Sequence, residues 1–141
     1  MTYISWFNEH ALKHKTIVDK LLKNGLSKEA IVDYFDFDNM VKEEKDFCLL
    51  YQDNKKCHDM DSLNCYLCAC PHFRFNDTGR VEGSKIKFSH CSIDSKYGSF
   101  FENDNKLHQD CTKCEIPHKK SYILKHFDYD FKKIMKDCSS F

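Results

Sequence analysis

Two pairs of cysteines with the same internal spacing are the residues of this 141-residue chain best suited to chemistry. Cys65 and Cys68 form the first pair, and Cys111 and Cys114 form the second. Two thiolates separated by two residues can face one metal ion, and two such pairs supply the four soft ligands of a tetrahedral site. The spacing therefore predicts that these four cysteines bind a metal ion.

Further donors lie close to both pairs. Cys70 follows Cys68 after a single residue and would be a fifth ligand, which a tetrahedral zinc site does not take. We therefore expect a second metal ion or a cluster, with Cys57, Cys91 and His118 among its ligands, and two zinc ions are favoured over one. The full predicted set of metal ligands is Cys57, Cys65, Cys68, Cys70, Cys91, Cys111, Cys114 and His118.

The remaining cysteines and histidines have weaker patterns. His58 follows Cys57 directly, and its role stays open between a ligand and a hydrogen-bond donor to a thiolate. Cys48 and Cys138 lie at the ends of helical stretches among apolar residues, where packing is the favoured role. Four histidines are expected at the surface or on a helix face: His10, His14, His108 and His126.

An iron-sulfur cluster is the chemical alternative to zinc. The run from Cys65 to Pro71, Cys-x-x-Cys-x-Cys-Pro, resembles the ferredoxin run that ends in Cys-Pro. Its spacing departs from that run, in which two residues separate each of the first three cysteines and three precede the last. In this alternative the protein is a metalloenzyme or a metal-transfer or redox protein, with a cluster or with a reactive thiolate such as Cys70.

Composition narrows the class of protein. Nine cysteines in a chain of this length indicate either disulfides or bound metal. The N-terminal residues carry no export signal, and no apolar stretch approaches about 18 residues, so we expect a cytoplasmic protein without a membrane span. Thiols stay reduced in the cytosol, which favours metal. The 22 basic and 22 acidic residues cancel, which argues against a protein-wide attraction to nucleic acid or anionic lipid.

The first 46 residues are predicted to be helical. Apolar residues recur at helical spacing up to Leu22, Gly25 ends this helix, and Ser27 caps a second one. A third short helix is expected over residues 38–45. The first two helices would form a hairpin, which is the surface we expect a protein partner to contact.

The rest of the chain has a different pattern of apolar residues. Residues 47–126 lack a sustained period, which predicts loops and short strands organised by metal, with a turn over residues 76–80 and a strand over residues 85–89. Apolar residues at helical intervals from Ser121 predict a C-terminal helix. The predicted fold class is α+β: an N-terminal helical hairpin, an irregular cysteine-rich module with short strands, and a C-terminal helix. The expected division of the chain is 1–46, 47–126 and 127–141.

Three segments of this chain resemble the cysteine-rich small domain family of prokaryotic proteins. They are Cys57-His58, the run from Asn64 to Pro71, and the run from Asp110 to Lys120. Members of the family share a Cys-His step, a Cys-x-x-Cys-x-Cys-Pro core and a Cys-x-x-Cys-x-x-Pro-His block. They are regarded as metal-binding modules, and some are joined to enzymes of cobalamin metabolism. The resemblance covers about residues 47–126 and implies metal binding, with a link to cobalamin metabolism under the enzyme alternative.

The expected function is therefore that of a small, zinc finger-like protein in which zinc folds the cysteine segment into a structural or interaction module. Binding to single-stranded nucleic acid is a weaker expectation, based on the basic and aromatic residues from His118 to His126. A solvated helix face explains the same residues.

Overall fold

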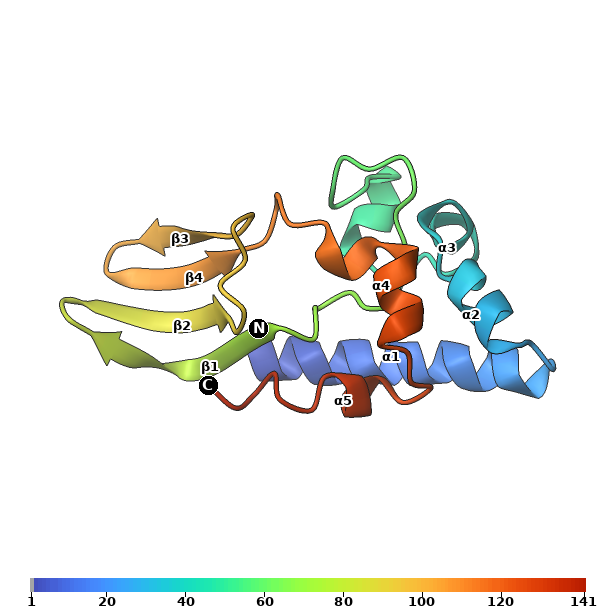
Figure 1. Cartoon of the computed structure of the whole chain (residues 1–141), viewed down its shortest axis with the longest axis horizontal. Coiled ribbons are helices and arrows are strands. Elements are labelled where there is room, and N and C mark those ends of the chain that lie inside the picture. The colour runs from blue at the N-terminus through green and yellow to red at the C-terminus, as the bar shows by residue number, and fades with distance from the viewer. Residues whose placement is uncertain (1) are drawn as a thin grey trace.

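The computed structural model of the chain describes residues 2–141 and begins with one long helix (Figure 1). Helix α1 spans Tyr3–Lys23. It starts in a capping box, in which the Thr2 side chain accepts from the Ser5 N–H and the Ser5 side chain bonds the Thr2 backbone. It ends before Gly25, whose φ of 79° is in the left-handed region that glycine adopts at low cost. The predicted first helix and its end are confirmed.

Two short helices follow α1. Helix α2 spans Lys28–Tyr34 and is capped by Ser27 as predicted, and α3 spans Phe37–Glu43. The third helix begins earlier than expected, with Asp36 rather than Asp38 at its N-cap. Helix α2 is only 7 residues long against 21 for α1, so the region consists of one long helix with two short helices after it, and the hairpin stays a prediction.

A four-stranded mixed sheet, counted over residues 2–141, lies at one end of α1 (Figure 1). Its order is β1-β2-β4-β3. The pairs β1–β2 and β3–β4 are antiparallel, and β2–β4 is parallel. The predicted strand at residues 85–89 is confirmed as part of β2. The strand bounds are β1 Phe73–Glu82, β2 Lys85–Cys91, β3 Ser99–Asn103 and β4 Lys106–Asp110.

The turn predicted at residues 76–80 is wrong, because this segment lies inside β1. Its turn chemistry is nevertheless present. The Thr78 N–H and hydroxyl both donate to Asn76 Oδ1, and Gly79 has a φ of 78°. The register of β1 against β2 shifts between Phe75 and Arg80. The turn residues thus produce a bulge within the strand.

The single C-terminal helix predicted from Ser121 is also wrong. The structure has two short helices, α4 over Lys120–Lys125 and α5 over Phe131–Ile134. Asp128 accepts from the Asp130 N–H, and Asp130 caps α5 by accepting from the Lys132 N–H. These local side-chain bonds compete with a continuous helix and divide the segment.

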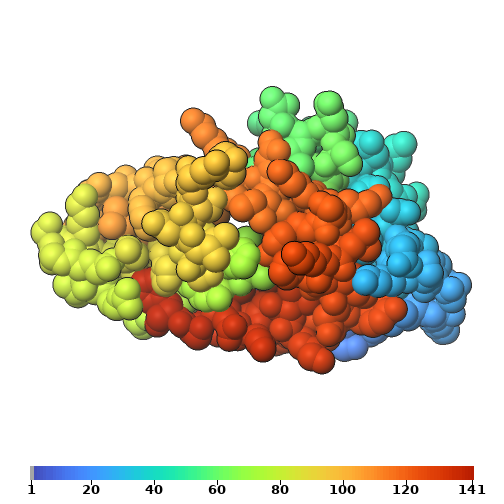
Figure 2. Space-filling model, viewed as in Figure 1, coloured from blue at the N-terminus to red at the C-terminus, as the bar shows by residue number. Residues whose placement is uncertain are grey.

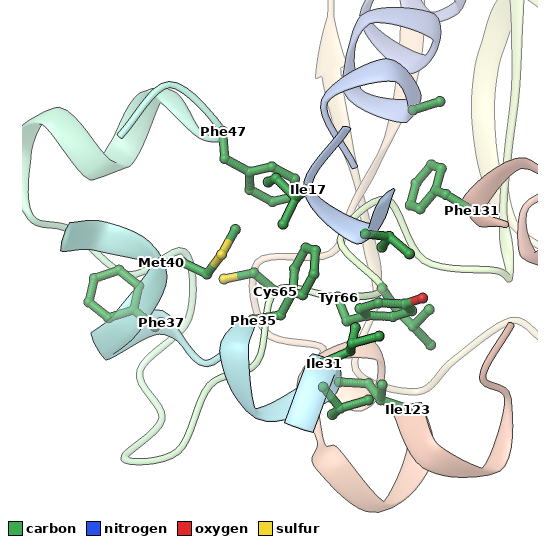
Figure 3. Close-up of a cluster of buried hydrophobic side chains, with 14 of the residues drawn as sticks. Ile17, Ile31, Phe35, Phe37, Met40, Phe47, Cys65, Tyr66, Ile123 and Phe131 are labelled. Atoms are coloured by element: carbon green, nitrogen blue, oxygen red, sulfur yellow. The ribbon is translucent and has the colours of Figure 1, made fainter. Parts of the chain in front are cut away.

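One hydrophobic core includes residues from all three predicted ranges. Ile17 of α1, Phe35 after α2, Tyr66 of the cysteine-rich loop, Ile123 of α4 and Phe131 of α5 belong to the same buried cluster (Figure 3). The cysteine-rich segment therefore shares the core of the helices, and the division into three domains stays a prediction.

Two short 3-10 helices complete the described chain: η1 over Leu49–Asp53 and η2 over Ile116–His118. Within residues 2–141, no helix has both the length and the apolar character that crossing a membrane requires.

Candidate metal centre

Asn64 holds together the segments that carry the candidate metal ligands. Its backbone N–H donates to the His118 carbonyl of η2 (3.1 Å), and its own carbonyl accepts from His118 Nδ1 (2.9 Å). The buried Asn64 amide also donates to the Val32 carbonyl and to Asp36 Oδ1, both at 2.7 Å. The loop before the first cysteine pair is thereby fixed both to η2 and to the short helices α2 and α3.

Cys57, His58 and His118 meet beside this anchor. Their ligand atoms all lie within 4.8 Å of one another, and over residues 2–141 they are the one group of three Cys, His or acidic side chains that does so. Cys57 Sγ lies 3.6 Å from His118 Nε2 and 3.0 Å from His58 Nδ1. The structure therefore contains a group that can hold a metal ion, formed by a cysteine and two histidines.

Backbone carbonyls set the orientation of both imidazoles. A carbonyl oxygen only accepts, so His118 Nδ1–H donates to the Asn64 carbonyl and His58 Nε2–H donates to the Cys111 carbonyl (2.9 Å). The other ring nitrogen of each histidine then carries its lone pair toward the Cys57 sulfur. A bond from the second ring nitrogen to a carbonyl is the usual arrangement at metal-binding histidines. Burial lowers the pKa of His118 to about 4, so the ring is neutral near pH 7, as a ligand must be.

The Cys57 to His118 spacing fits zinc. With bonds of about 2.3 Å to sulfur and about 2.0 Å to nitrogen, a tetrahedral zinc ion places the two donor atoms about 3.5 Å apart. The observed separation is 3.6 Å. The 3.0 Å contact of His58 Nδ1 is shorter, so this ring would have to move outward to admit an ion.

Further thiols line a small cavity behind Cys57 and His118. This cavity, of about 40 Å³, is also lined by Cys48, Cys65 and Cys68. Cys65 belongs to the hydrophobic core and is drawn among the side chains of Figure 3. The predicted ligands Cys57, Cys65, Cys68 and His118 are thus neighbours, together with Cys48, for which packing was expected.

Burial keeps these thiols protonated in the absence of a cation. Desolvation raises the pKa of Cys57 to about 11 and that of Cys65 to about 12. The Tyr51 hydroxyl opposes the rise at Cys65, and neighbouring thiols add smaller increases at both residues. Desolvation, followed by neighbouring thiols, also raises the pKa of Cys68. A bound divalent ion reverses this balance because it stabilises the thiolate directly. These thiols therefore become thiolates near pH 7 only when a metal ion binds them.

Four other cysteines line a second cavity, of about 30 Å³: Cys70, Cys91, Cys111 and Cys114. Of the two predicted pairs, Cys65 and Cys68 line the first small cavity and Cys111 and Cys114 line the second, whereas Cys68, Cys111 and Cys114 also share a larger chamber. Each of the nine cysteines, all within residues 2–141, is a free thiol. The structure gives no cystine that would compete with metal among them.

A larger, mostly apolar chamber of about 600 Å³ adjoins both groups of thiols. Its lining includes Cys57, His58 and His118 together with the aromatic residues Tyr3 and Trp6 near the start of α1. An ion held by Cys57 and His118 would face this chamber.

Sequence reasoning missed two residues of the centre. Asn64 enters the sequence pattern only as the residue before a motif, although its backbone bonds His118 and its side chain bonds Val32 and Asp36. Its position directly before the first cysteine pair is the one signal that points to it. Tyr51, which is 2% exposed and lines the first cavity, has a hydroxyl without a hydrogen-bond partner among the described residues. Nothing in its sequence context indicates that placement.

Comparison of the chain with protein-family models, with curated proteins and with solved structures finds no match. The resemblance to the cysteine-rich small domain family is therefore a similarity of cysteine and histidine spacing. What the structure adds is nine free thiols and the Cys57, His58 and His118 group.

Proposed function

We propose that this protein binds zinc through Cys57, His58 and His118 and uses the ion to fold a structural or interaction module. The observation that carries the proposal is the orientation of the two imidazoles. Both rings are fixed by backbone carbonyls so that their free nitrogens face the Cys57 sulfur. Two imidazoles and one thiol converge here without a positive charge beside them. A divalent cation would bind all three donors.

A thiol of the adjoining cavity completes the tetrahedron. Cys65 and Cys68 line this cavity together with Cys57 and His118. The Tyr51 hydroxyl lines the same cavity close enough to Cys65 to lower the pKa of that thiol, without a hydrogen bond of normal geometry. A metal-bound thiolate would be a stronger acceptor for it. The mixture of sulfur and imidazole nitrogen favours zinc over an iron-sulfur cluster, which is usually held by four thiolates.

The proposed role of the ion is structural. Structural zinc contributes about 10 to 16 kcal/mol of apparent binding free energy, which is comparable with the whole stability of a domain. We propose that the protein works in the cytoplasm and that the surface of α1, α2 and α3 contacts a protein partner. The alternative is a redox role with an iron-sulfur cluster, and the test below distinguishes it from structural zinc.

The test is the metal content of the full chain purified anaerobically, measured by plasma mass spectrometry with a visible spectrum. We expect zinc in a colourless protein, and we expect Cys57→Ser and His118→Asn each to lose about one zinc ion per chain. His126→Asn is the matched control, because His126 is an exposed histidine outside the group. Unchanged zinc in Cys57→Ser and His118→Asn would refute the site. A brown protein with stoichiometric iron and sulfide would replace zinc by a cluster.

A further inference from the structure

The cavity lined by Cys70, Cys91, Cys111 and Cys114 has the composition of a complete metal site. Its other lining side chains are uncharged: Phe73, Ser95, Gly98, Gln109 and Pro117. Its volume of about 30 Å³ exceeds the 10 to 15 Å³, roughly, that a water molecule occupies by the same measure. Four thiols are the donors of a Cys₄ structural zinc site, although among the described residues no three of these four sulfurs lie within 4.8 Å of one another.

The topology of the sheet brings two of these cysteines together. Strands β2 and β4 are parallel neighbours, with Ile86 paired to Lys106 and Lys87 paired to Leu107. Continued along both strands, this register brings Cys91, the last residue of β2, opposite Cys111, which directly follows β4. Parallel strands end at the same edge of a sheet, so the position of both thiols follows from the β2–β4 pairing.

The other two cysteines reach this edge through tight turns. The Cys114 N–H donates to the Cys111 carbonyl (3.0 Å), which closes the turn of the second pair. The Phe73 N–H at the start of β1 donates to the Cys70 carbonyl (3.0 Å), and Phe73 pairs with Cys91. All four sulfur-bearing residues are thus tied by backbone bonds or strand register to one edge of the sheet.

The backbone at Cys70 separates the two groups of thiols. Ala69 and Cys70 have φ values of 103° and 60°, a left-handed conformation that residues other than glycine rarely adopt. This kink lies between Cys68, which lines the first cavity, and Cys70, which lines the second. Strained backbone of this kind persists where the surrounding structure requires it, and here it directs neighbouring cysteines to different cavities.

Polar groups around the second cavity suit metal-bound thiolates. Ser95 Oγ lies 3.5 Å from Cys114 Sγ and can donate to a thiolate there. The Cys91 N–H donates to Gln109 Oε1 (3.0 Å), and the Gln109 N–H donates to Ser89 Oγ (2.7 Å), which fixes the end of β2 against β4. In Figure 2 the yellow-orange segment 92–98 and the orange segment 111–118, which share this cavity, lie side by side on the visible face.

We infer that Cys70, Cys91, Cys111 and Cys114 bind a second zinc ion, separate from the ion of Cys57, His58 and His118. The two Cys-x-x-Cys pairs then serve different ions, and the chain binds two ions in all. Binding would draw the four sulfurs to about 3.8 Å from one another, the spacing that bonds of about 2.3 Å give in a tetrahedron. This second site depends on its own cavity and does not require the first site to exist.

Zinc content of single-cysteine variants tests the inference. We expect two zinc ions per full-length wild-type chain and about one in Cys91→Ser and in Cys114→Ser. Cys138→Ser, which removes a buried cysteine that lines neither small cavity, should keep both. Cys91→His retains a zinc donor, so it should restore the second ion if Cys91→Ser fails to fold.

Cobalt(II) substitution gives an independent measurement, because the thiolate-to-cobalt absorption reports how many sulfurs are bound. Most of this absorption should be lost in Cys91→Ser and Cys114→Ser. One zinc ion in the wild type with unchanged content in Cys91→Ser would overturn the second site, as would a disulfide among its four cysteines in the metal-loaded protein. Loss of an ion in Cys91→Ser but not in Cys57→Ser would refute the first site alone.

Discussion

His14 is a buried ionisable residue whose charge state depends on the fold. Its ring is fully buried among the rings of Phe35, Tyr66 and Phe131. Nε2–H donates to the Tyr66 carbonyl (3.1 Å), and Nδ1 has no partner within the described chain. Burial, the largest cause, lowers the pKa of His14 to about 3. The neutral ring thus belongs to the core, next to the loop that carries the first cysteine pair.

This burial predicts a loss of stability in acid. The pKa of His14 is lower in the folded chain than the roughly 6.5 of an unfolded one, so protons bind the unfolded chain better. The stability that the neutral ring contributes is complete well above pH 6.5. It declines as the pH falls toward 3, by at most about 1.4 kcal/mol per pH unit. In urea unfolding, we expect the wild type to lose about 1 kcal/mol more than His14→Gln between pH 6.5 and pH 5.5. Equal losses would show that His14 does not titrate on unfolding.

At the scale of elements, the bulge in β1 depends on one glycine. Gly79 has a φ of 78°, and a Cβ atom there would lie 2.4 Å from Ile86 Cγ2 and 3.0 Å from Phe88 Cε1 of β2. Gly83, in the β1–β2 turn, also has a positive φ of 63°, but a Cβ atom there would meet nothing within 4 Å. The two glycines share the backbone requirement and differ in their packing against β2.

We therefore expect Gly79→Ala to be much more destabilising than Gly83→Ala. Both substitutions place alanine in the left-handed region, at a cost of about 1 kcal/mol. Only Gly79→Ala adds a clash with side chains of β2, for a further 1 to 3 kcal/mol, roughly. Chemical denaturation of the metal-loaded variants measures the difference. Equal destabilisation would mean that β1 does not pack on β2 as the structure shows.

At the scale of the whole molecule, two helix boundaries set by neighbours in sequence could be predicted, whereas features set by distant pairing could not. The N-cap at Ser27 and the helix end at Gly25 depend on adjacent residues, and the structure confirms both. The partition of the cysteines depends on the parallel pairing of β2 with β4. Spacing along the chain carries no information about that pairing. The pairs Cys65/Cys68 and Cys111/Cys114 are therefore predicted at one ion from spacing alone, whereas in the structure each pair lines a different small cavity beside the larger chamber.

The shared core makes the proposed metal sites and the long helix α1 mutually dependent. The cysteine-rich loop contributes Leu63, Tyr66 and Leu67 to the buried cluster that also holds the inner face of α1. The His14 ring of α1 bonds the Tyr66 carbonyl directly. If zinc holds that loop in place, its removal exposes the side of the core on which α1 packs, and most of the stability of a helix in a protein comes from such packing.

We therefore expect chelation to unfold α1 together with the cysteine-rich segment. Amide hydrogen exchange read by mass spectrometry on the full chain, before and after a zinc chelator, tests this. Peptides from α1 and from residues 57–70 should lose protection together, and added zinc should restore both. If residues 57–70 exchanged freely while α1 stayed protected, the helix would be stable independently of the metal. The predicted division near residue 46 would then describe separate folding units, whereas joint loss would make the chain one cooperative unit built around its metal ions.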